Sequence, residues 1–167
     1  MEPVSECRSV EMKQEIFYEP IKTWLTSKGL RAFVTGQRAN FVIPVSDLVP
    51  AIYKIPDLVG LTENGRVVIV EVEKNKKHFF DALGRCMLWK CIATFVYLAY
   101  PKGECPRTGI LNRLGIGLLE VDCDSCTIDE RVSLPGEGPK ILRLFELHPL
   151  DFAKEQQLAS RIRGTFC

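Results

Sequence analysis

The sequence predicts an α/β domain with a mixed central β-sheet flanked by helices. Three features predict this class: a hairpin that ends in an apolar strand at 66–73, a helical pattern at 79–94, and a second apolar strand directly behind it at 95–100. A hairpin pairs its strands antiparallel, whereas a helix between two strands is the usual crossover to a parallel neighbour. Because no repeat or low-complexity segment divides the chain, we expect a single domain over 1–167.

The composition is that of a soluble globular protein with a core of its own, since 46% of the 167 residues are hydrophobic and 26% are charged. The net charge of +1 excludes a global attraction to nucleic acid, so any nucleic-acid surface must be a local patch. The longest apolar stretch, 91–100, is too short to cross a bilayer. Residues 1–13 lack the apolar core of a secretory signal, so we expect the seven cysteines to be reduced thiols in a cytoplasmic protein.

The first part of the chain predicts one helix and one strand. Apolar residues at helical spacing predict an amphipathic helix over 11–29, with Gly29 as its C-terminal cap. Pro20 then lies either in the first turn of a shorter helix or at a kink of a longer one. A strand follows at 30–35, and the prolines within 41–52 predict an irregular connection.

The central hairpin, formed by strands at 53–61 and 66–73, ends in two carboxylates. Because side chains alternate along a strand, Glu71 and Glu73 share one face, whereas Val72 points to the other. Burying a glutamate costs free energy unless the carboxylate is paired or binds a cation. We therefore expect a core strand whose C-terminal end opens into a cleft.

Asp57 joins these carboxylates only if the hairpin has the right register. A two-residue turn would point Asp57 away from Glu71, whereas a three-residue loop at 63–65 would place the two residues opposite each other. Such a loop needs a left-handed residue at its last position, which Gly65 supplies. A bulge near Pro56 would also correct the register.

The order of Pro56-Asp57, a short hairpin and Glu71-Val72-Glu73 resembles the PD-(D/E)xK nuclease superfamily, and so do the helix and strand that follow. The resemblance covers roughly residues 11 to 122 and implies a restriction-endonuclease-like core. It also implies a metal-dependent nuclease that hydrolyses phosphodiester bonds of nucleic acid, with DNA as the expected substrate and Mg²⁺ or Mn²⁺ as the cofactor. The expected partner is nucleic acid, and we further expect a homodimer and no membrane association.

Asp57 and Glu71 are the expected metal ligands, and by resemblance the backbone carbonyl of Val72 is a third. Clustered carboxylates raise one another's pKa and favour a cation, and Mg²⁺ held by one or two carboxylates keeps positions for water and phosphate. The first helix of the superfamily often adds a carboxylate to the site, which points to Glu19. The alternative is that Glu15 and Glu19, one turn apart, are simply solvated.

The superfamily's lysine position holds Glu73 in this chain, which could act as a general base or a further metal ligand. Lys74 could replace the lysine only if the strand ends at Glu73, so Lys76 or Lys77 is the better candidate. The expected catalytic residues are Asp57, Glu71, Glu73 and Lys77. Two alternatives remain open. The chain could be a catalytically inactive module that binds nucleic acid or a protein partner, or its acids could be a structural network paired with Arg66, Arg85 or Lys77.

The basic segment 74–78 is either a solvated loop or a phosphate contact made by Lys74, Lys76 and Lys77. The helix at 79–94 should bury a stripe formed by Phe80, Leu83, Met87 and Cys91. On another face Arg85 occupies the position where the superfamily carries a polar residue that faces the site. Arg85 could bind phosphate there, or pair with Asp81 one turn away.

Behind the strand at 95–100 the sequence predicts a short helix at 108–113 and strands at 115–121, 128–134 and 141–147, and a polar helix with Asp151 near its N-cap. Cys123 and Cys126 have the spacing of a metal knuckle or a redox pair. Because the chain contains no second such pair, we expect them in or next to a turn and free of zinc.

Overall fold

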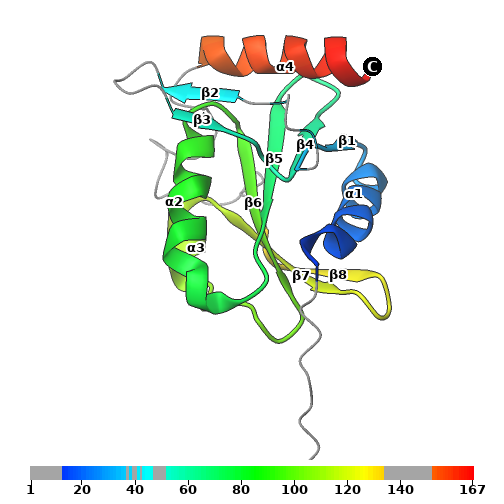
Figure 1. Ribbon diagram of the computed structural model, residues 1–167, viewed down its shortest axis with the longest axis vertical. Helices are drawn as coiled ribbons and strands as arrows, with labels where there is room; N and C mark the ends of the chain where they lie inside the picture. Colours follow the sequence, from blue (N-terminus) through cyan, green and yellow to red (C-terminus); the bar gives the residue numbers. More distant parts are fainter. Residues whose placement is uncertain (1–12, 37, 39–40, 42, 47–51, 134–151) are drawn as a thin grey trace, which may run out of the picture.

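A six-stranded mixed sheet with the order β1-β4-β5-β6-β7-β8 forms the centre of the molecule (Figure 1). The structure is a computed structural model and describes residues 13–36, 38, 41, 43–46, 52–133 and 152–167. The strands of this sheet are β1 (Arg31–Val34), β4 (Leu58–Leu61), β5 (Val67–Val72), β6 (Phe95–Pro101), β7 (Gly117–Asp122) and β8 (Thr127–Val132). β5, β6 and β7 run parallel, and the other neighbours pair antiparallel. The predicted mixed α/β class is confirmed.

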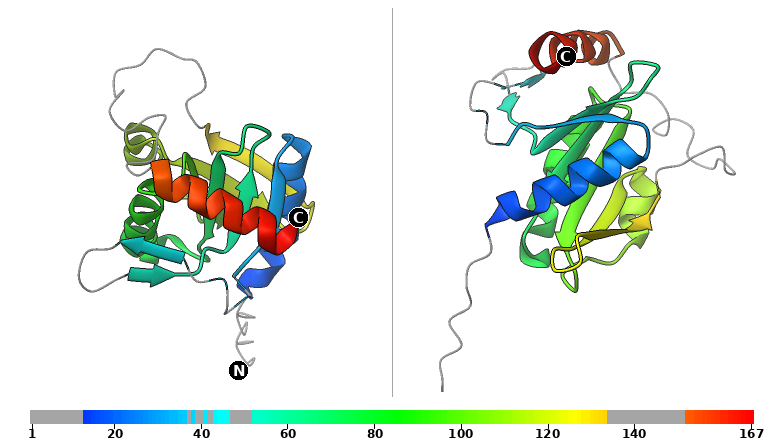
Figure 2. Two further views of the ribbon diagram at one scale, coloured as in Figure 1. Left: turned by 90° about the horizontal axis from the view of Figure 1, so that it is seen from above. Right: turned by 90° about the vertical axis from the view of Figure 1, so that its right-hand side faces the viewer.

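Helices cover both faces of the sheet and one of its ends. Helix α1 (Tyr18–Ser27) lies on one face, α2 (Phe79–Lys90) and α3 (Gly109–Leu114) lie on the other, and α4 (Phe152–Phe166) crosses the end where β5 begins (Figures 1 and 2). Short 3₁₀ turns, η1 (Gln14–Phe17) and η2 (Lys76–His78), precede α1 and α2. Among the described residues, every helix falls short of the length and apolarity needed to cross a membrane.

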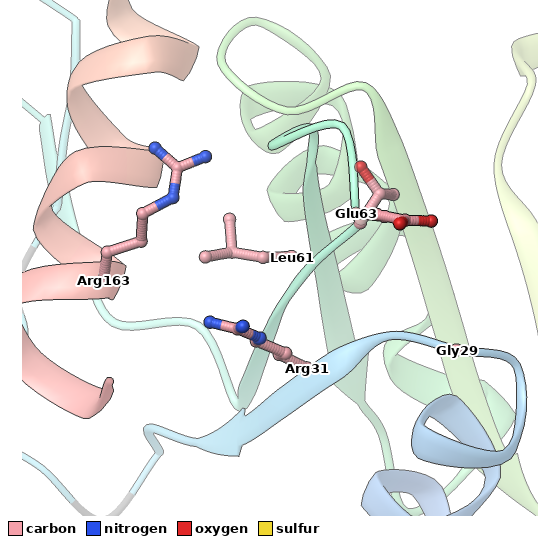
Figure 3. A pocket seen from close by; sticks show the side chains of 6 residues that line it. Gly29, Arg31, Leu61, Glu63 and Arg163 are labelled. Carbon is pink, nitrogen blue, oxygen red and sulfur yellow. The ribbon is translucent and has the colours of Figure 1, made fainter.

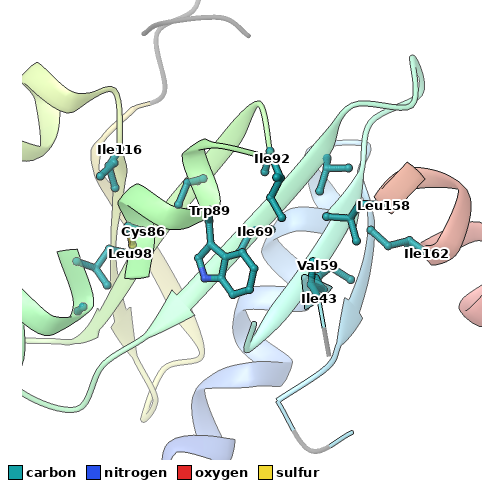
Figure 4. Close-up of a cluster of buried hydrophobic side chains, with 14 of the residues drawn as sticks. Ile43, Val59, Ile69, Cys86, Trp89, Ile92, Leu98, Ile116, Leu158 and Ile162 are labelled. Atoms are coloured by element: carbon teal, nitrogen blue, oxygen red, sulfur yellow. The ribbon is translucent and has the colours of Figure 1, made fainter. Parts of the chain in front are cut away.

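The hydrophobic core is split by the sheet into two clusters. Ile69 and Leu98 pack on the side of α2, α3 and α4 with Trp89 (Figure 4). Val68 and Val70 pack on the other side against α1. The alternation predicted for β5 is therefore confirmed, and it directs Glu71 to the side of α2.

The β4–β5 hairpin has the register of the predicted three-residue loop. Leu58 pairs with Val70, so that Asp57, one residue earlier, is level with Glu71. The Gly65 N–H donates to the Thr62 carbonyl at 2.9 Å, and Gly65 has a φ of 74°, a left-handed conformation that favours glycine. The turn thereby sets which residues meet at the far end of the hairpin.

The chain between β1 and β4 differs from the prediction. Segments β2 (Ile43–Ser46) and β3 (Ile52–Lys54) form a separate two-stranded ribbon with a register shift after Pro44, where an irregular connection was expected. The expected strand at 53–61 is interrupted, because β3 pairs with β2 and only β4 joins the central sheet. Pro56 lies in the interruption and has no N–H for a ladder.

The predicted stripe of the helix after β5 is wrong for two of its four members, since Leu83 and Cys91 pack against the core but Phe80 and Met87 do not. Phe80 is 78% exposed and Met87 is 36% exposed, whereas Ala82, Cys86 and Trp89 are fully buried. The small side chains of Ala82 and Cys86 face the sheet and allow close packing, which an apolarity ranking overlooks. The helix also ends at Lys90, four residues before the predicted end.

The other predicted elements agree with the structure where it describes them. Pro20 lies in the first turn of α1, and Gly29 follows the helix with a φ of 81°. The short helix and both strands expected between 108 and 134 are present as α3, β7 and β8. The strand expected at 141–147 and the N-cap at Asp151 lie outside the described residues.

A buried glutamate anchors α4 to the sheet. Oε1 of Glu155 accepts hydrogen bonds from the Val67 N–H at 3.1 Å, the Thr94 N–H at 2.9 Å and the Thr94 hydroxyl at 2.6 Å. Arg66 Nε lies 3.0 Å from the other carboxylate oxygen, Oε2, and forms an ion pair with it. Glu155 thus satisfies amides at the starts of β5 and β6 that the sheet itself does not pair.

Candidate functional site

Three carboxylates gather at the C-terminal end of β5. Asp57 immediately precedes β4, Glu71 lies in β5, and Glu73 follows the end of that strand. The Glu73 N–H still donates to the Ala99 carbonyl at 2.9 Å, so the chain remains beside β6 at this point. Glu71 is only 3% exposed, which places a carboxylate inside the protein and requires partners for it.

Asp57 is held by neutral donors on the side of α1. Its Oδ1 accepts from the Tyr18 hydroxyl at 2.8 Å, and its Oδ2 accepts from Gln14 Nε2 at 3.0 Å and the Val72 N–H at 2.8 Å. Burial raises the pKa of Asp57 even though the bonds from Val72 and Tyr18 lower it. Burial and the nearby Asp57 charge raise the pKa of Tyr18, so its hydroxyl keeps its proton and donates.

Gln14 also connects Asp57 to the strand. Besides Asp57 Oδ2, Gln14 Nε2 donates to the Val72 carbonyl at 2.5 Å. Two oxygens that the sequence predicted as metal ligands therefore converge on one point. Gln14 was not predicted as a site residue; it lies in η1, directly before α1, and reaches the same carboxylate as Tyr18.

Glu71 is held on the opposite side of the sheet by α2. Its Oε2 accepts from Arg85 Nε at 2.8 Å, and its Oε1 accepts from Trp89 Nε1 at 2.6 Å. Burial, followed by the charge of Asp57, raises the pKa of Glu71 to about 7, while Arg85 and Trp89 act in the opposite direction. This carboxyl therefore exchanges its proton near neutral pH.

Arg85 bridges two of the acids. Its Nη2 lies 3.0 Å from Glu73 Oε2, while its Nε binds Glu71. Asp81, the alternative partner one turn away, is exposed. The predicted structural pairing through Arg85 is therefore present for Glu71 and Glu73, whereas the hydrogen-bond donors to the Asp57 carboxylate among the described residues are uncharged.

Close packing around the site depends on a glycine. An ideal Cβ on Gly36 would lie 2.8 Å from the Tyr18 hydroxyl oxygen and 2.9 Å from Asp57 Oδ1, closer than real Cβ atoms approach. The Gly36 N–H donates to the Asp57 carbonyl at 2.9 Å, which brings this backbone beside the carboxylate. Gly36 carries no sequence pattern that marks it as a site residue.

Tyr100 is a further residue at this site that was not predicted from the sequence. The β5–β6 register places it beside Glu73 on the side of α2, and it is fully buried. Its hydroxyl has no hydrogen-bond partner among the described residues. A buried unpaired hydroxyl is uncommon and often marks a place where a water or ligand is bound.

The other predicted site residues do not join this cluster. Glu19 is exposed and lies 3.7 Å from Lys22, so Tyr18 and Gln14, rather than Glu19, approach the site from the N-terminal helical segment. Lys76 and Lys77 are exposed on η2, which follows the acids directly in the chain.

Lys74 and Arg66 are two further candidate cations, and they lie at opposite ends of β5. The Lys74 N–H donates to Glu73 Oε1 at 3.0 Å, and its side chain is half-buried. β5 ends at Val72, so Lys74 lies beyond the strand. Arg66 instead pairs with Glu155 at the other end of the strand.

Asp57 Oδ2 and the Val72 carbonyl oxygen are the two atoms that could hold a cation together, because one nitrogen of Gln14 lies within 3.0 Å of both. Asp57 Oδ2 and the Val72 carbonyl already converge, whereas both Glu71 oxygens are engaged by side-chain donors. Within the described part of the chain, no three His, Cys, Asp or Glu residues form a group suited to a metal ion. Cys123 and Cys126 are free thiols at the β7–β8 turn, as predicted for their position.

Comparisons with known proteins show a likeness of fold. No protein-family model matches the chain, and no curated protein matches it. Among solved structures the chain is similar to SPO1766, a protein of unknown function from Silicibacter pomeroyi, with a TM-score of 0.60 and 13% sequence identity over 93% of this chain and 87% of that one. At this identity the likeness concerns the fold alone, and it supports the α/β architecture described above.

Proposed function

We propose that this chain is a metal-dependent nuclease with a restriction-endonuclease-like core, and that its substrate is DNA. The order of elements supports the proposal: Asp57 precedes β4, the β4–β5 hairpin follows, the acids lie at the end of β5, and α2 leads to the parallel strand β6. The acids belong to a site at a strand end, which is a common place for ligand binding in α/β proteins.

The convergence of Asp57 Oδ2 and the Val72 carbonyl on Gln14 Nε2 carries this proposal. A carboxylate oxygen and a backbone carbonyl that share one donor within 3.0 Å form a small, electronegative position. Mg²⁺ prefers oxygen ligands of this kind and keeps several waters when only one or two carboxylates bind it. Exchange of the amide hydrogens for a cation at that position requires only a rotation of the Gln14 side chain.

A divalent cation held there supplies a water nucleophile and neutralises charge on the phosphate. Asp57 and Val72 would hold the ion, and Glu71, with a pKa of about 7, would accept a proton near neutral pH. Arg85 carries a planar guanidinium suited to bidentate contact with a phosphate once it leaves one carboxylate. Lys76 and Lys77 extend the same end of the molecule with exposed positive charge.

The test combines metal binding with cleavage. Calorimetric titration with Mn²⁺ and Mg²⁺, and cleavage assays on single-stranded and duplex DNA and RNA, should show binding and cleavage by the wild type. Asp57→Asn, which keeps the shape of the side chain, should lower cleavage by at least about 100-fold, as expected for loss of an electrostatic contribution of several kcal/mol. Asp124→Asn, at an exposed acid of the β7–β8 turn, is the matched control and should leave both readouts unchanged. A wild type that binds neither ion at millimolar concentration contradicts the proposal.

A second candidate function is favoured by the Arg85 bridge. A guanidinium that already neutralises Glu71 and Glu73 occupies the acids that an enzyme would use, and it suits an inactive module that binds nucleic acid or a protein partner. In this case the wild type should bind oligonucleotides, or retain a protein partner, without cleavage in any divalent cation.

Glu73→Lys separates the two candidates. In an inactive module the substitution restores the superfamily's lysine position, so some cleavage should appear where the wild type has none. In a working enzyme the new ammonium faces Arg85 in place of a carboxylate 3.0 Å away, and activity should fall or stay unchanged. Cleavage rates of both proteins, measured with the same Mn²⁺ concentration and substrate, decide between these outcomes.

A further inference from the structure

A second polar hollow lies at the other end of the β4–β5 hairpin from the three acids. It has a volume of about 300 Å³ and opens between α4 and the hairpin turn (Figure 3). Arg31 and Arg163 reach toward the same space beside Leu61 in Figure 3, although they come from β1 and α4. The full lining consists of Gly29, Arg31, Leu61, Thr62, Glu63 and Arg163.

Two arginine side chains give this pocket its positive charge. Arg66, Arg85 and Arg131 each lie within 4 Å of a carboxylate. Within the described ranges, by contrast, neither Arg31 nor Arg163 forms a side-chain hydrogen bond or ion pair. Two guanidinium groups thus direct their donors into one hollow, which also contains a single carboxylate, that of Glu63.

Arg163 is placed there by two rigid features. Helix α4 is fixed by the buried Glu155, and Ile162, next to Arg163, is fully buried in the core. On the turn side, an ideal Cβ on Gly65 would lie 2.3 Å from Arg163 Nη2. The guanidinium therefore rests against the turn at the residue where the loop also needs a left-handed backbone, and less side-chain entropy is lost when it binds an anion.

We propose that this pocket binds a phosphate group, held between Arg31 and Arg163. A guanidinium matches the oxygens of a phosphate bidentately, and two of them from separate elements fix its position. The Glu63 carboxylate in the lining repels an anion and keeps the affinity moderate. The phosphate belongs either to a nucleic-acid strand or to a small phosphate ester. The assignment does not depend on the nuclease proposal, because binding here requires no cleavage.

The test measures anion binding by the full chain. Titration with inorganic phosphate, followed by amide chemical shifts of 29–31, 61–65 and 163, should show saturable binding at the pocket. Arg31→Gln and Arg163→Gln should each weaken it at least tenfold, whereas Glu63→Gln should tighten it severalfold because a like charge is removed. Arg113→Gln makes the same charge change on exposed α3 and is the matched control.

The source of the phosphate follows from a second arm with a fluorescent single-stranded oligonucleotide and with a nucleoside monophosphate. Weaker oligonucleotide binding in Arg31→Gln and Arg163→Gln, but not in Arg113→Gln, assigns the pocket to a nucleic-acid strand. Unchanged oligonucleotide binding with weakened monophosphate binding assigns it to a small ester. Equal effects of all three arginine variants, equal affinity for acetate and phosphate, or no shift at the pocket would overturn the proposal. Unfolding midpoints of all variants guard against loss of the fold.

Discussion

The protonation of Glu71 depends on the fold. Its pKa rises from 4.5 to about 7 through burial first and the charge of Asp57 second. The folded chain therefore binds this proton more tightly than the unfolded chain does. The corresponding stability is fully present below pH 4.5 and is lost as the pH rises through about 7.

Glu71→Gln should flatten this pH dependence, because the amide side chain does not ionise between pH 4 and pH 8. We expect the free energy of unfolding, measured with urea from pH 4 to pH 8, to fall less steeply in Glu71→Gln than in the wild type. Because Asp57 and Glu71 raise each other's pKa, the substitution also moves the pKa of Asp57 toward its ordinary value, which flattens the curve further. Glu63→Gln removes an exposed carboxylate and should follow the wild-type curve. Parallel curves for Glu71→Gln and wild type would contradict the assignment.

Gly36 and Gly84 should respond to alanine with opposite signs. At Gly36 a Cβ would separate the Tyr18 hydroxyl from Asp57, so we expect a loss of about 1–3 kcal/mol in the free energy of unfolding. At Gly84, on the exposed side of α2, a Cβ meets nothing within 4 Å, and alanine should stabilise the helix by about 0.5–1 kcal/mol. Chemical denaturation of the two variants measures both effects, and a destabilised Gly84→Ala would refute the packing argument.

The Gln14 amide should compete with a cation for the position between Asp57 Oδ2 and the Val72 carbonyl oxygen. Gln14→Ala removes the amide donor between Asp57 and the Val72 carbonyl, so we expect Mn²⁺ to bind severalfold more tightly in calorimetry. Without metal, the variant should lose about 1 kcal/mol of stability with its hydrogen bonds. Weaker Mn²⁺ binding would mean instead that the side-chain amide of Gln14 rotates and coordinates the ion through its oxygen.

Among the elements, the attachment of α4 to the sheet should depend on a single side chain, that of Glu155. Glu155→Ala leaves the Val67 and Thr94 amides and Arg66 without their buried acceptor, so we expect a loss of about 3–5 kcal/mol and faster amide exchange at both positions. Gln157→Ala, at an exposed position of the same helix, should change stability by less than about 0.5 kcal/mol. Equal effects of the two substitutions would mean that apolar packing alone holds α4.

An element could be predicted from the sequence where one local feature determines its conformation. Gly65 determined the hairpin register, because a three-residue loop needs a left-handed last residue. The buried side of α2 was not predictable in the same way, since Ala82 and Cys86 are buried for their size while Phe80 remains exposed. Pro44 likewise indicated irregular structure, but a short ribbon tolerates it beside a register shift.

Across the whole molecule, the acids of the candidate site were predictable and their partners were not. Alternation along β5 and the hairpin register brought Asp57, Glu71 and Glu73 to one strand end. The donors come from packing between distant segments: Tyr18 lies 39 positions from Asp57, and Gln14 lies 58 positions from Val72. A glutamine at that distance carries no pattern that marks it as a site residue.

The anchor of α4 has a consequence for the order in which the chain folds during synthesis. The amides of Val67 and Thr94 precede their acceptor Glu155 by 88 and 61 positions. At a translation rate of about 5–20 residues per second, Glu155 is synthesised roughly 4–18 s after Val67 of β5. During this interval the hairpin can form, because its register depends on its own turn, but the starts of β5 and β6 remain open to water. The hydrogen bonds at this end of the sheet are completed only after α4 has been synthesised and has packed against it.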